Sequence, residues 1–462
     1  MDERDFTREE VMKQFSVRSM IRVISVAVLC GASTVHAGLF RTYLSLNGND
    51  ANPCTVQLPC RLLPAALAAV NDGGEIWMID SANFNTAPVS ITKSVKILAI
   101  PGQMGSVVGN GGDAIDINTS GDVTLRNLQI LNFSGGVDGI NIANAGAVHI
   151  EKTSIDGFTN GSTACIHLDS SSTVRLYIDD SFVRHCNIAL FVNGSNTANK
   201  TSVIVDNTRI ERGFSSTPTA GVWMQGAVDV ILRNTSISRQ SQAIHFENPT
   251  TNSDLVIDRC EITRSDSGLV YTNGVLNAQG HMTIKNSAIS GNGDLIDVSN
   301  SAVGGTTQLM VSDTVLSNGT NGVTVANSAA DTNTRVFVEL VRSQVKSITT
   351  AGASLNATNG AKAYLYAHDS EFAHSATAIQ TSGSGAGGVT VSLVRSIISH
   401  VTTAIDHGFG EVRLDGSHVV NNANDFVNNG SGNIVSLGNN MVTDNTNASG
   451  FTYITPAIIA PK

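Results

Sequence analysis

Histidine, arginine and carboxylate side chains recur between residues 140 and 272 at spacings suited to acid–base chemistry. His245 and His167 are candidate general bases, and Arg239 is a candidate for neutralising a substrate carboxylate. A lyase that acts on a uronate polymer needs both functions, because the proton beside the carboxylate is removed only when its charge is offset. His167 and Asp169, two residues apart, form the tightest acid–base couple in the sequence. We interpret these residues as candidates for lyase chemistry on a sugar polymer.

The same segment carries residue types that bind sugars without reacting. Aromatic rings stack on sugar rings, and polar groups beside them bond to hydroxyls. The alternative for Phe191 and Trp223 is a place beneath a turn loop, as a small satellite of the core, and both interpretations stay open. The candidate substrate-binding residues are Trp223, Phe191, Arg184, Arg212, Arg264, Asp169, Gln225 and Glu247.

Four arginines are expected to form one column on consecutive repeats: Arg184, Arg212, Arg239 and Arg264. On an acidic protein, such a positive stripe would match an acidic glycan. The alternative, which we slightly favour, is a solvated ion-pair ladder with nearby carboxylates. The expected partners in that ladder are Glu211, Glu261 and Asp266.

Other chemistries lack the residues they need. Asp169 and Glu247 are expected three repeats apart, roughly 14 Å at the spacing of stacked strands, which is too far for a glycosidase carboxylate pair. We find no cluster of metal ligands, no phosphate-binding loop and no nucleophile elbow in the sequence. The sequence therefore predicts neither a metal nor a cofactor.

Length and charge exclude several classes of protein. With 462 residues, the chain is too long for one ordinary compact core, and 14% charged residues exclude a coiled coil. Lys and Arg number 28 against 38 Asp and Glu, which gives a net charge of −10. Because no basic block stands against this excess, we do not expect nucleic acid as a partner.

The first residues have the form of an export signal. An apolar run from Val23 to Leu29 follows Arg18 and Arg22, and small residues precede Gly38. We predict a signal peptide over 1–37, with translation starting at Met1 or Met12, and hence a secreted or periplasmic protein. The run is too short to cross a bilayer, so no membrane span should remain after cleavage. An uncleaved N-terminal anchor is the alternative.

Export would place the cysteines in an oxidising compartment. Cys54 and Cys60 are close enough in sequence to close a small loop by a disulfide, but two free thiols are an equal alternative. Cys165 and Cys186 receive no partner from the sequence.

The elements that must position these residues follow from an internal repeat. An eight-residue pattern, apolar-x-apolar-x-Asn/Asp-Ser/Thr-x-apolar, occurs in thirteen copies, from VTLRNLQI at residue 123 to VSLGNNMV at 435. Period-two alternation indicates strands, and a fixed interval in the twenties indicates one stacked unit per repeat. The sequence thus predicts an all-β, single-stranded right-handed parallel β-helix of about 13 coils with a short N-terminal helical cap.

Two columns of polar residues are expected to serve this scaffold. Small residues such as Thr208, Thr235 and Cys260 should point inward and bond along the stack. Asn and Asp just before them should form a ladder of tight turns, because both tolerate the left-handed conformation. The expected turn residues are Asn127, Asp179, Asn207, Asn234, Asn286, Asp313, Asp369 and Asn439.

From about Gly74 to Val442 the sequence resembles the pectin-lyase-like right-handed β-helix proteins, which carry an Asn ladder at the turn between strands. The segment 64–70 (PAALAAV) is similar to the helix that caps the N-terminal end in that family. The expected organisation is a cap region over 38–75, a β-helix over 76–445 and a tail over 446–462. The resemblance implies a polysaccharide along the groove of the short strand that follows each repeat. It does not imply an activity, because the fold also serves epimerases, adhesins and inert shafts.

Our hypothesis is an exported β-helix that binds, and in lyase fashion cleaves, an extracellular anionic polysaccharide along the groove from about Ile140 to Thr272. The alternative is a non-catalytic structural or surface-adhesion protein. Its support is the run of late coils from Asn300 to Gly432, which is rich in Ser, Thr, Asn and Gly and carries no candidate site.

Overall fold

The computed structural model describes residues 38–160, 163–195, 197–213, 219–249, 253–291 and 293–447. The predicted signal peptide over 1–37 and most of the predicted tail lie outside these residues. A single compact unit begins at Phe40. None of the helices in the described ranges has the length and apolar character needed to cross a membrane.

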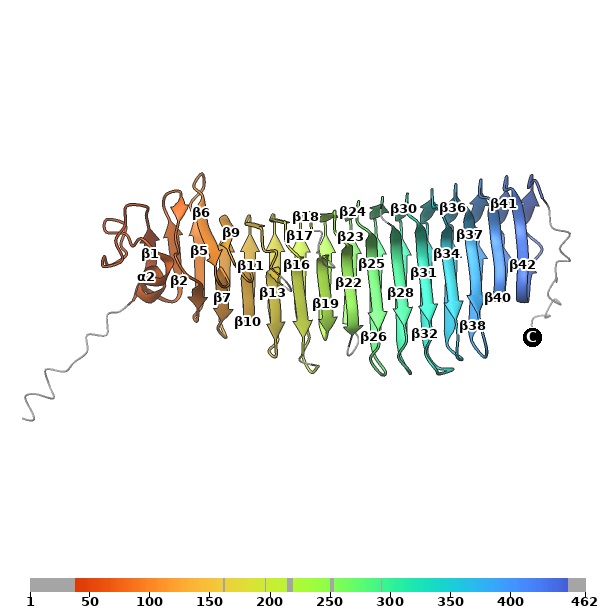
Figure 1. The fold of residues 1–462 in the computed structure, drawn as a ribbon, viewed down its shortest axis with the longest axis horizontal. Helices are drawn as coiled ribbons and strands as arrows, with labels where there is room; N and C mark the ends of the chain where they lie inside the picture. The colour runs from red at the N-terminus through yellow and green to blue at the C-terminus, as the bar shows by residue number, and fades with distance from the viewer. Residues whose placement is uncertain are drawn as a thin grey trace, which may run out of the picture. The chain divides into compact units, whose positions relative to one another are not determined.

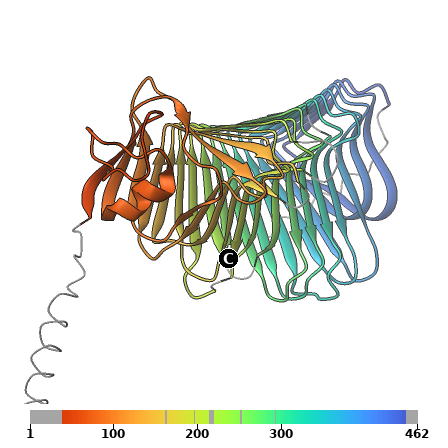
Figure 2. The same cartoon turned by 60° about the vertical axis from the view of Figure 1, so that its left-hand side comes forward.

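Most coils of this unit contain three strands, which pair in parallel with the corresponding strands of the next coil (Figures 1 and 2). In one coil these strands are β13 (Ala164–Ser170), β14 (Arg175–Asp179) and β15 (Phe182–Arg184). Repetition along the chain produces three faces, which we name A1, A2 and B after the strands β13, β14 and β15 respectively. Faces A1 and A2 count as one 28-stranded sheet because β40 and β42 continue around the corner between them.

The remaining strands are assigned to the three faces by their pairing. Face A1 contains β4 (Val89–Ile91), β7 (Ile115–Asn118), β10 (Ile140–Asn144), β16 (Ile188–Gly194), β19 (Ala220–Gly226), β22 (Gln242–Pro249), β25 (Ser267–Asn273), β28 (Asp294–Asn300), β31 (Asn321–Asn327), β34 (Ala351–Ala357), β37 (Thr377–Gly383) and the first parts of β40 (Thr403–Asp415) and β42 (Asn424–Ser436). Face A2 contains β1 (Leu39–Leu44), β2 (Val70–Met78), β5 (Val95–Ala99), β8 (Asp122–Arg126), β11 (Ala147–Glu151), β17 (Thr201–Asp206), β20 (Val228–Arg233), β23 (Ser253–Asp258), β26 (Gln279–Lys285), β29 (Thr306–Ser312), β32 (Arg335–Val341), β35 (Lys362–His368), β38 (Gly388–Val394) and the last parts of β40 and β42. Face B contains β3 (Ala82–Asn83), β6 (Gly105–Asn110), β9 (Leu128–Ser134), β12 (Ser154–Asp156), β18 (Arg209–Glu211), β21 (Ser236–Ser238), β24 (Glu261–Thr263), β27 (Ala288–Ser290), β30 (Val315–Ser317), β33 (Gln344–Lys346), β36 (Glu371–Ala373), β39 (Ile397–Ser399), β41 (His418–Val420) and β43 (Met441–Thr443).

Face B is a 15-stranded sheet with one strand per coil, so the stack has about 15 coils rather than the 13 expected. The two additional coils are the first, which end in β3 and β6. The first has Asp80-Ser81 before β3 but Asn83 where the pattern requires an apolar residue, and the second lacks the pair, so that the corner before β6 is made by Gly102 with φ 86°. Because a glycine adopts positive φ without a steric penalty, that coil turns without the repeat signature.

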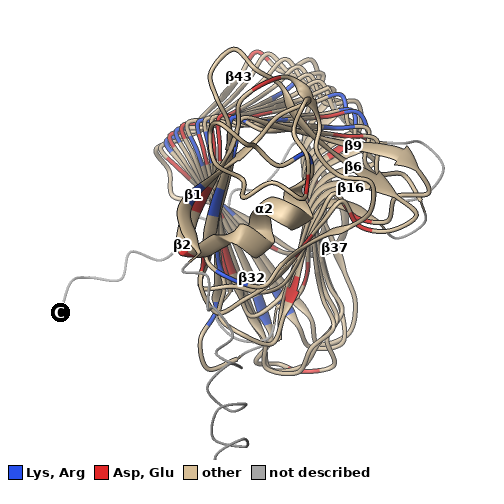
Figure 3. Ribbon diagram, turned by 90° about the vertical axis from the view of Figure 1, so that its left-hand side faces the viewer, with Lys and Arg blue, Asp and Glu red and all other residues tan. Residues whose placement is uncertain are grey.

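A short helix, α2 (Leu63–Ala69), precedes these coils at the place expected from the sequence. Leu63, Ala66 and Leu67 are buried and join the core. Figure 3 shows the helix at the near end of the view along the stack. That the helix acts as a cap stays a prediction.

The core runs along the inside of the coils, as period-two alternation predicts. On β17, Val203 and Val205 are buried, whereas the intervening Ile204 faces outward and is half-buried. Val205 stands in register between Ile178 and Leu232 of the adjacent coils. Buried apolar area stabilises each coil by ~25 cal/mol per Å², but only when a neighbouring coil covers it.

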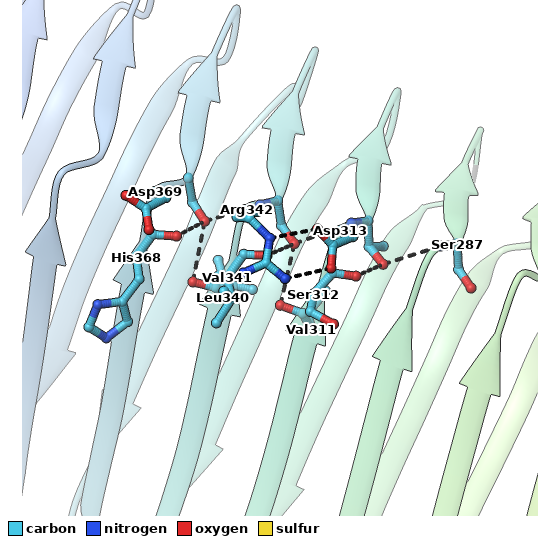
Figure 4. Close-up of polar contacts among 12 residues, drawn as sticks. Ser287, Val311, Ser312, Asp313, Leu340, Val341, Arg342, His368 and Asp369 are labelled. Atoms are coloured by element: carbon cyan, nitrogen blue, oxygen red, sulfur yellow. Dashed lines mark hydrogen bonds and ion pairs between the residues drawn. The ribbon is translucent and has the colours of Figure 1, made fainter.

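Hydroxyl groups bond along the stack beside this core. Thr314 Oγ1 donates to the Ser312 carbonyl at 2.7 Å and accepts from the Ser287 amide at 3.3 Å. Ser343 Oγ accepts in the same way from the Thr314 amide. Figure 4 shows this corner of the stack, where Arg342 is bonded to Asp313 of the neighbouring coil. Cys260 occupies this column as a buried thiol, and burial raises its pKa to about 11. These side chains satisfy backbone groups at the corner and are scaffold rather than chemistry.

The turn ladder lies directly before the hydroxyl column. Asn207 has φ 45° and Asn286 has φ 51°, both in the left-handed region. In the coil with two consecutive aspartates, the turn residue is Asp180 with φ 51°, so the expectation for Asp179 is wrong. The pairing of Asp179 with Asp206 places Asp179 at the outward end of β14. In the last coil the positive φ falls on Gly438 instead of the expected Asn439.

Two disulfides lie within the described residues. One joins Cys54 and Cys60, whose Cα atoms are 4.6 Å apart, and corresponds to one of the two alternatives left by the sequence. The other joins Cys165 and Cys186 across 21 residues. This second pairing depends on how one coil lies against the next, which the spacing of cysteines does not reveal.

We predict that Asn207→Val destabilises the protein by about 1–2 kcal/mol, because a β-branched residue is strained at positive φ. Asn207→Gly is the matched control. It loses the same hydrogen bond to Asp180 but carries no Cβ. Urea unfolding measures both variants, and equal losses of unfolding free energy would contradict the strain at this corner.

We also predict one titratable thiol in the chain from Gly38 onward, prepared under oxidising conditions. Of its five cysteines, four are paired and Cys260 is buried and free. A thiol reagent should therefore react slowly with the native protein and with one thiol per chain after unfolding. Three or five thiols in the unfolded protein would exclude one or both disulfides.

Candidate functional site

Four rings stand in register on consecutive strands of face A1: His167, Phe191, Trp223 and His245. We call them the ring strip. The ring centroids are 5.0 Å apart between His167 and Phe191, 6.0 Å between Phe191 and Trp223, and 4.9 Å between Trp223 and His245. The strip is thus a continuous aromatic band that crosses four coils, on the column expected from the sequence.

A column of polar side chains runs beside the ring strip, two residues further along each strand. Asn193 Nδ2 donates to Asp169 Oδ1 at 3.0 Å. Trp223 Nε1 donates to Glu247 Oε2 at 3.1 Å, which ties this column to the rings. Gln225 lies in register between Asn193 and Glu247. The arrangement offers carboxylate and amide groups within reach of a molecule lying on the rings.

The two rings at the centre of the strip are partly supported from below. Phe191 and Trp223 are half-buried and pack against a small apolar cluster of Ala164, Ile188 and Ala220. Phe191 and Trp223 therefore belong to a small satellite core, as one of the two interpretations expected. Each ring is nevertheless partly exposed, as stacking on a sugar would require. A ring held in this way loses little conformational entropy on binding.

His167 is held by a carboxylate that the sequence interpretation missed. Its Nδ1 lies 2.6 Å from Asp138 Oδ2, so its partner is Asp138 of the preceding coil rather than Asp169. Asp138 is buried, and its other oxygen accepts from the Ala164 amide. The hydrogen bond to Asp138 raises the pKa of His167, and the partial burial of the ring opposes this by a smaller amount. In the sequence, the feature that could have identified Asp138 as this partner is its position in the loop just before Gly139-Ile140.

Two more carboxylates lie behind this pair, on the coils toward the N-terminus. Asp116 is in register with Asn141, and Asn141 with His167. Burial raises the pKa of Asp116, and a hydrogen bond with Asp113 raises it further. Asn141 Nδ2 donates to Asp116 Oδ1 at 3.1 Å. This end of the ring strip is therefore acidic, and burial together with Asp113 favours the protonated form of Asp116.

His245 differs from His167 although both belong to the ring strip. Burial lowers its pKa, so the ring is neutral at neutral pH. Its Nε2 lies 3.4 Å from Thr272 Oγ1, and its Nδ1 is buried without a hydrogen-bond partner within the described ranges. His245 is a base by charge state, but only Nε2 is placed to meet a ligand.

The column of four arginines expected from the sequence is wrong at one member. Arg184 is in register with Asp156 and Glu211, one residue before the corner. His185, with φ 51°, occupies the left-handed corner that Arg212, Arg239 and Arg264 share in the following coils.

The arginines of these coils also differ in their partners. Arg184 Nε donates to Asp156 Oδ2 at 2.8 Å, whereas the one side-chain partner of Arg212 among the described residues is His185, at 3.4 Å. Glu211, expected as a partner of this column, binds Arg209 instead at 2.6 Å. Across the described ranges Arg239 and Arg264 have no ion pair and no side-chain hydrogen bond. Arg184 thus has a carboxylate partner, but not one of the three expected, whereas Arg239 and Arg264 have none among the described residues.

The structure brings some of the predicted catalytic residues together and separates others. His167 and His245 belong to one strip, three coils apart, which is roughly 14 Å at the spacing of parallel strands. Arg239 lines a hollow over face B together with Arg264, and no hydrogen bond or ion pair links it to either histidine. No group of three His, Cys, Asp or Glu side chains that could hold a metal ion occurs in the described parts of the chain.

We predict opposite titrations for the two histidines of the ring strip. In NMR titrations of the ring protons, His167 should titrate above its ordinary value of about 6.5 and His245 below it. Asp138→Asn should lower the pKa of His167 and leave that of His245 unchanged. Because folding raises the pKa of His167, its contribution to stability is present below about pH 6.5 and lost as pH rises through the folded-state pKa. If His167 has the same pKa in the variant as in the unaltered protein, Asp138 is excluded as the cause of the raised pKa.

Comparison with known proteins concerns the scaffold. Residues 164–337 match the family model described as "Right handed beta helix region". No curated protein sequence matches the chain. Among solved structures the chain is similar to pectate lyase Pel9A, at 13% identity over 91% of this chain and 81% of that chain, with a TM-score of 0.34. It is similar to the A-module of mannuronan C-5 epimerase AlgE6 from Azotobacter vinelandii (12% identity, 77% and 94% covered, TM-score 0.46). It is also similar to the GH136 lacto-N-biosidase from Eubacterium ramulus (11% identity, 87% and 68% covered, TM-score 0.27).

The matched residues begin at the first residue of β13 and end within β32, so they lie wholly inside the stack of coils. The parallel pairing of every coil with the next extends the same architecture on both sides. The fold predicted from the repeats is therefore confirmed, and the chain is a right-handed parallel β-helix repeat protein.

Proposed function

We propose that this protein is exported and binds an extracellular polysaccharide along face A1, on the coils from about Ile140 to Thr272. The observation that carries the proposal is the ring strip, with its parallel column of hydrogen-bonding groups. Consecutive rings stand one coil apart, ~4.8 Å, so successive sugar units of an extended chain can each meet a ring. The carboxylates of Asp169 and Glu247 accept hydrogen bonds from sugar hydroxyls.

The polysaccharide is proposed to be anionic, with its charged groups away from the acidic end of the strip. Asp138, Asp116 and Asp169 would repel a carboxylate beside His167. Arg239 and Arg264, which have no carboxylate partner among the described residues, stand at the corners just before β22 and β25 of face A1, where they provide the positive charge that an acidic polymer requires.

Lyase cleavage is a second candidate function, favoured by the His167–Asp138 pair. Asp138 engages Nδ1 and leaves Nε2 to take the proton beside a uronate carboxylate. The bond from the neighbouring carbon to the leaving sugar oxygen then breaks, a carbon–carbon double bond forms, and the oxygen gains a proton. A cationic group is needed to neutralise the uronate carboxylate, but the described charged groups that act on His167 are aspartates. Binding is for this reason our first function and cleavage the second.

We predict that Trp223→Ala weakens polysaccharide binding by about tenfold, because it removes the largest ring of the strip. Tyr364→Ala is the matched control, since Tyr364 also stacks on a neighbouring ring, Phe337, but on face A2. Affinity electrophoresis against a panel of neutral and acidic polysaccharides measures both. Equal retardation of the two variants would contradict a site on face A1. Absence of binding to the whole panel would favour the structural or adhesive alternative.

For cleavage, we predict that a uronate polymer incubated with the protein gains the ultraviolet absorbance of unsaturated products. His167→Gln should abolish this gain, and Asp138→Asn should reduce it by about 10²–10⁴-fold, the range typical of a positioned acid–base group. Binding retained without absorbance would leave a binding protein.

A further inference from the structure

A hollow of about 580 Å³ lies over face B, on the coils whose corners carry Arg239 and Arg264. Its floor is made of short side chains, because Ser236 and Ser238 of β21, Thr263 of β24 and Ser290 of β27 occupy the outward positions there. The register places Ser238, Thr263 and Ser290 in one line across three coils. The floor thus presents a row of hydroxyl groups, and its size is within the range of small-ligand sites.

The rim of the hollow carries two guanidinium groups that nothing in the described protein neutralises. Arg239 has φ 59° and Arg264 has φ 56°, a conformation that is uncommon for residues other than Gly, Asn, Asp and His. At the equivalent corner, the next two coils have Gly291 and Asn318, which adopt it more readily. Arginine is therefore conformationally costly at these two places.

Arginines at the other corner of the coil also have positive φ, but their charges are matched. Arg342 donates to both oxygens of Asp313 at 2.8 Å, and Arg395 is held by Asp369 in the same manner. Arg239 and Arg264, on adjacent coils, have no such partner among the residues that the structure describes. Like charges on adjacent coils repel each other, and a bound anion between them would reverse this repulsion.

The charge balance of the hollow selects the kind of anion. The third arginine at its edge, Arg209, is bound to Glu211 at 2.6 Å and lies over the ring of Phe182, so its charge is already matched. Glu261 has no ion pair among the described residues and faces the same hollow. Among the described residues that line the hollow, two unpaired guanidinium groups and one unpaired carboxylate give a net charge of +1, which suits a monoanion and leaves a phosphate dianion partly unmatched.

We propose that this hollow binds the monoanionic group of an acidic sugar, a carboxylate or a sulfate ester, between Arg239 and Arg264. Guanidinium groups bind either anion through paired N–H donors. The hydroxyl row and Glu261 then bond to the hydroxyls of the same sugar. The ligand class rests on the proposed function, whereas the place does not, because the hollow lies on face B and the ring strip on face A1.

The test uses isothermal titration calorimetry on the chain from Gly38 onward, with three probes. They are tetragalacturonate, its carboxyl-reduced neutral counterpart, and a sulfated galactan oligosaccharide of similar length. The variant is Arg239→Gln/Arg264→Gln. The matched control is Arg342→Gln/Arg395→Gln, which removes the same charge at the other corner. Thermal unfolding confirms that both variants are folded.

The proposal expects the Arg239→Gln/Arg264→Gln variant to bind an acidic probe at least tenfold more weakly than the unaltered chain. The control should bind normally, and the neutral probe should not distinguish the variants. Tetragalacturonate or the sulfated probe, whichever shows this loss, identifies the anion. Equal weakening by both double variants, or failure of the unaltered chain to bind either acidic probe, would overturn the proposal.

Trp223→Ala separates this inference from the proposed function. If it leaves all binding intact while Arg239→Gln/Arg264→Gln still weakens an acidic probe, the ring strip fails and the hollow stands. The reverse result would remove the hollow and retain the strip.

Discussion

The parallel pairing of each coil with the next, at ~4.8 Å, is the interaction on which the rest of this structure depends. Because no coil can bury its own apolar side, each inward residue must meet an inward residue of similar kind in the neighbouring coils. The stack of Ile178, Val205 and Leu232 shows this requirement met. The hydroxyl column and the left-handed turns follow from the same constraint, since every coil must turn at the same place and satisfy the same backbone groups there.

The constraint also shapes the two candidate surfaces. When coils are in register, an outward residue type repeated in sequence becomes a continuous band in space. The ring strip arises in this way on face A1, and the row of short side chains arises in this way on face B. The two surfaces differ in charge, because carboxylates surround one end of the ring strip, whereas guanidinium groups with no ion pair in the described part of the chain border the hollow. A polysaccharide that combines hydroxyl-rich and anionic parts would match this division.

Much of the scaffold and part of the site could be read from the repeats. The column His167, Phe191, Trp223 and His245 was expected in that order, because alternation and the repeat interval together set the register. The interpretation failed where the local pattern was ambiguous by one residue. Asp179 and Asp180 are both good turn residues, and the sequence interpretation took the wrong one. The same shift of one position placed Arg184 at the next corner, whereas in the structure it lies one residue before that corner.

By itself the sequence determined the strand period, the identity of the inward columns and the outward order of rings on face A1, because these depend on neighbours along the chain and on a repeated interval. The tertiary structure alone decided the pairings between groups that no repeat specifies. Asp138, in the loop of the preceding coil, forms a hydrogen bond with His167. Glu211 forms an ion pair with Arg209 instead of Arg212, and Cys165 forms a disulfide with Cys186. Each of these depends on how a side chain leaves a loop or corner and crosses to the next coil, which is a distance in space and not a spacing in sequence.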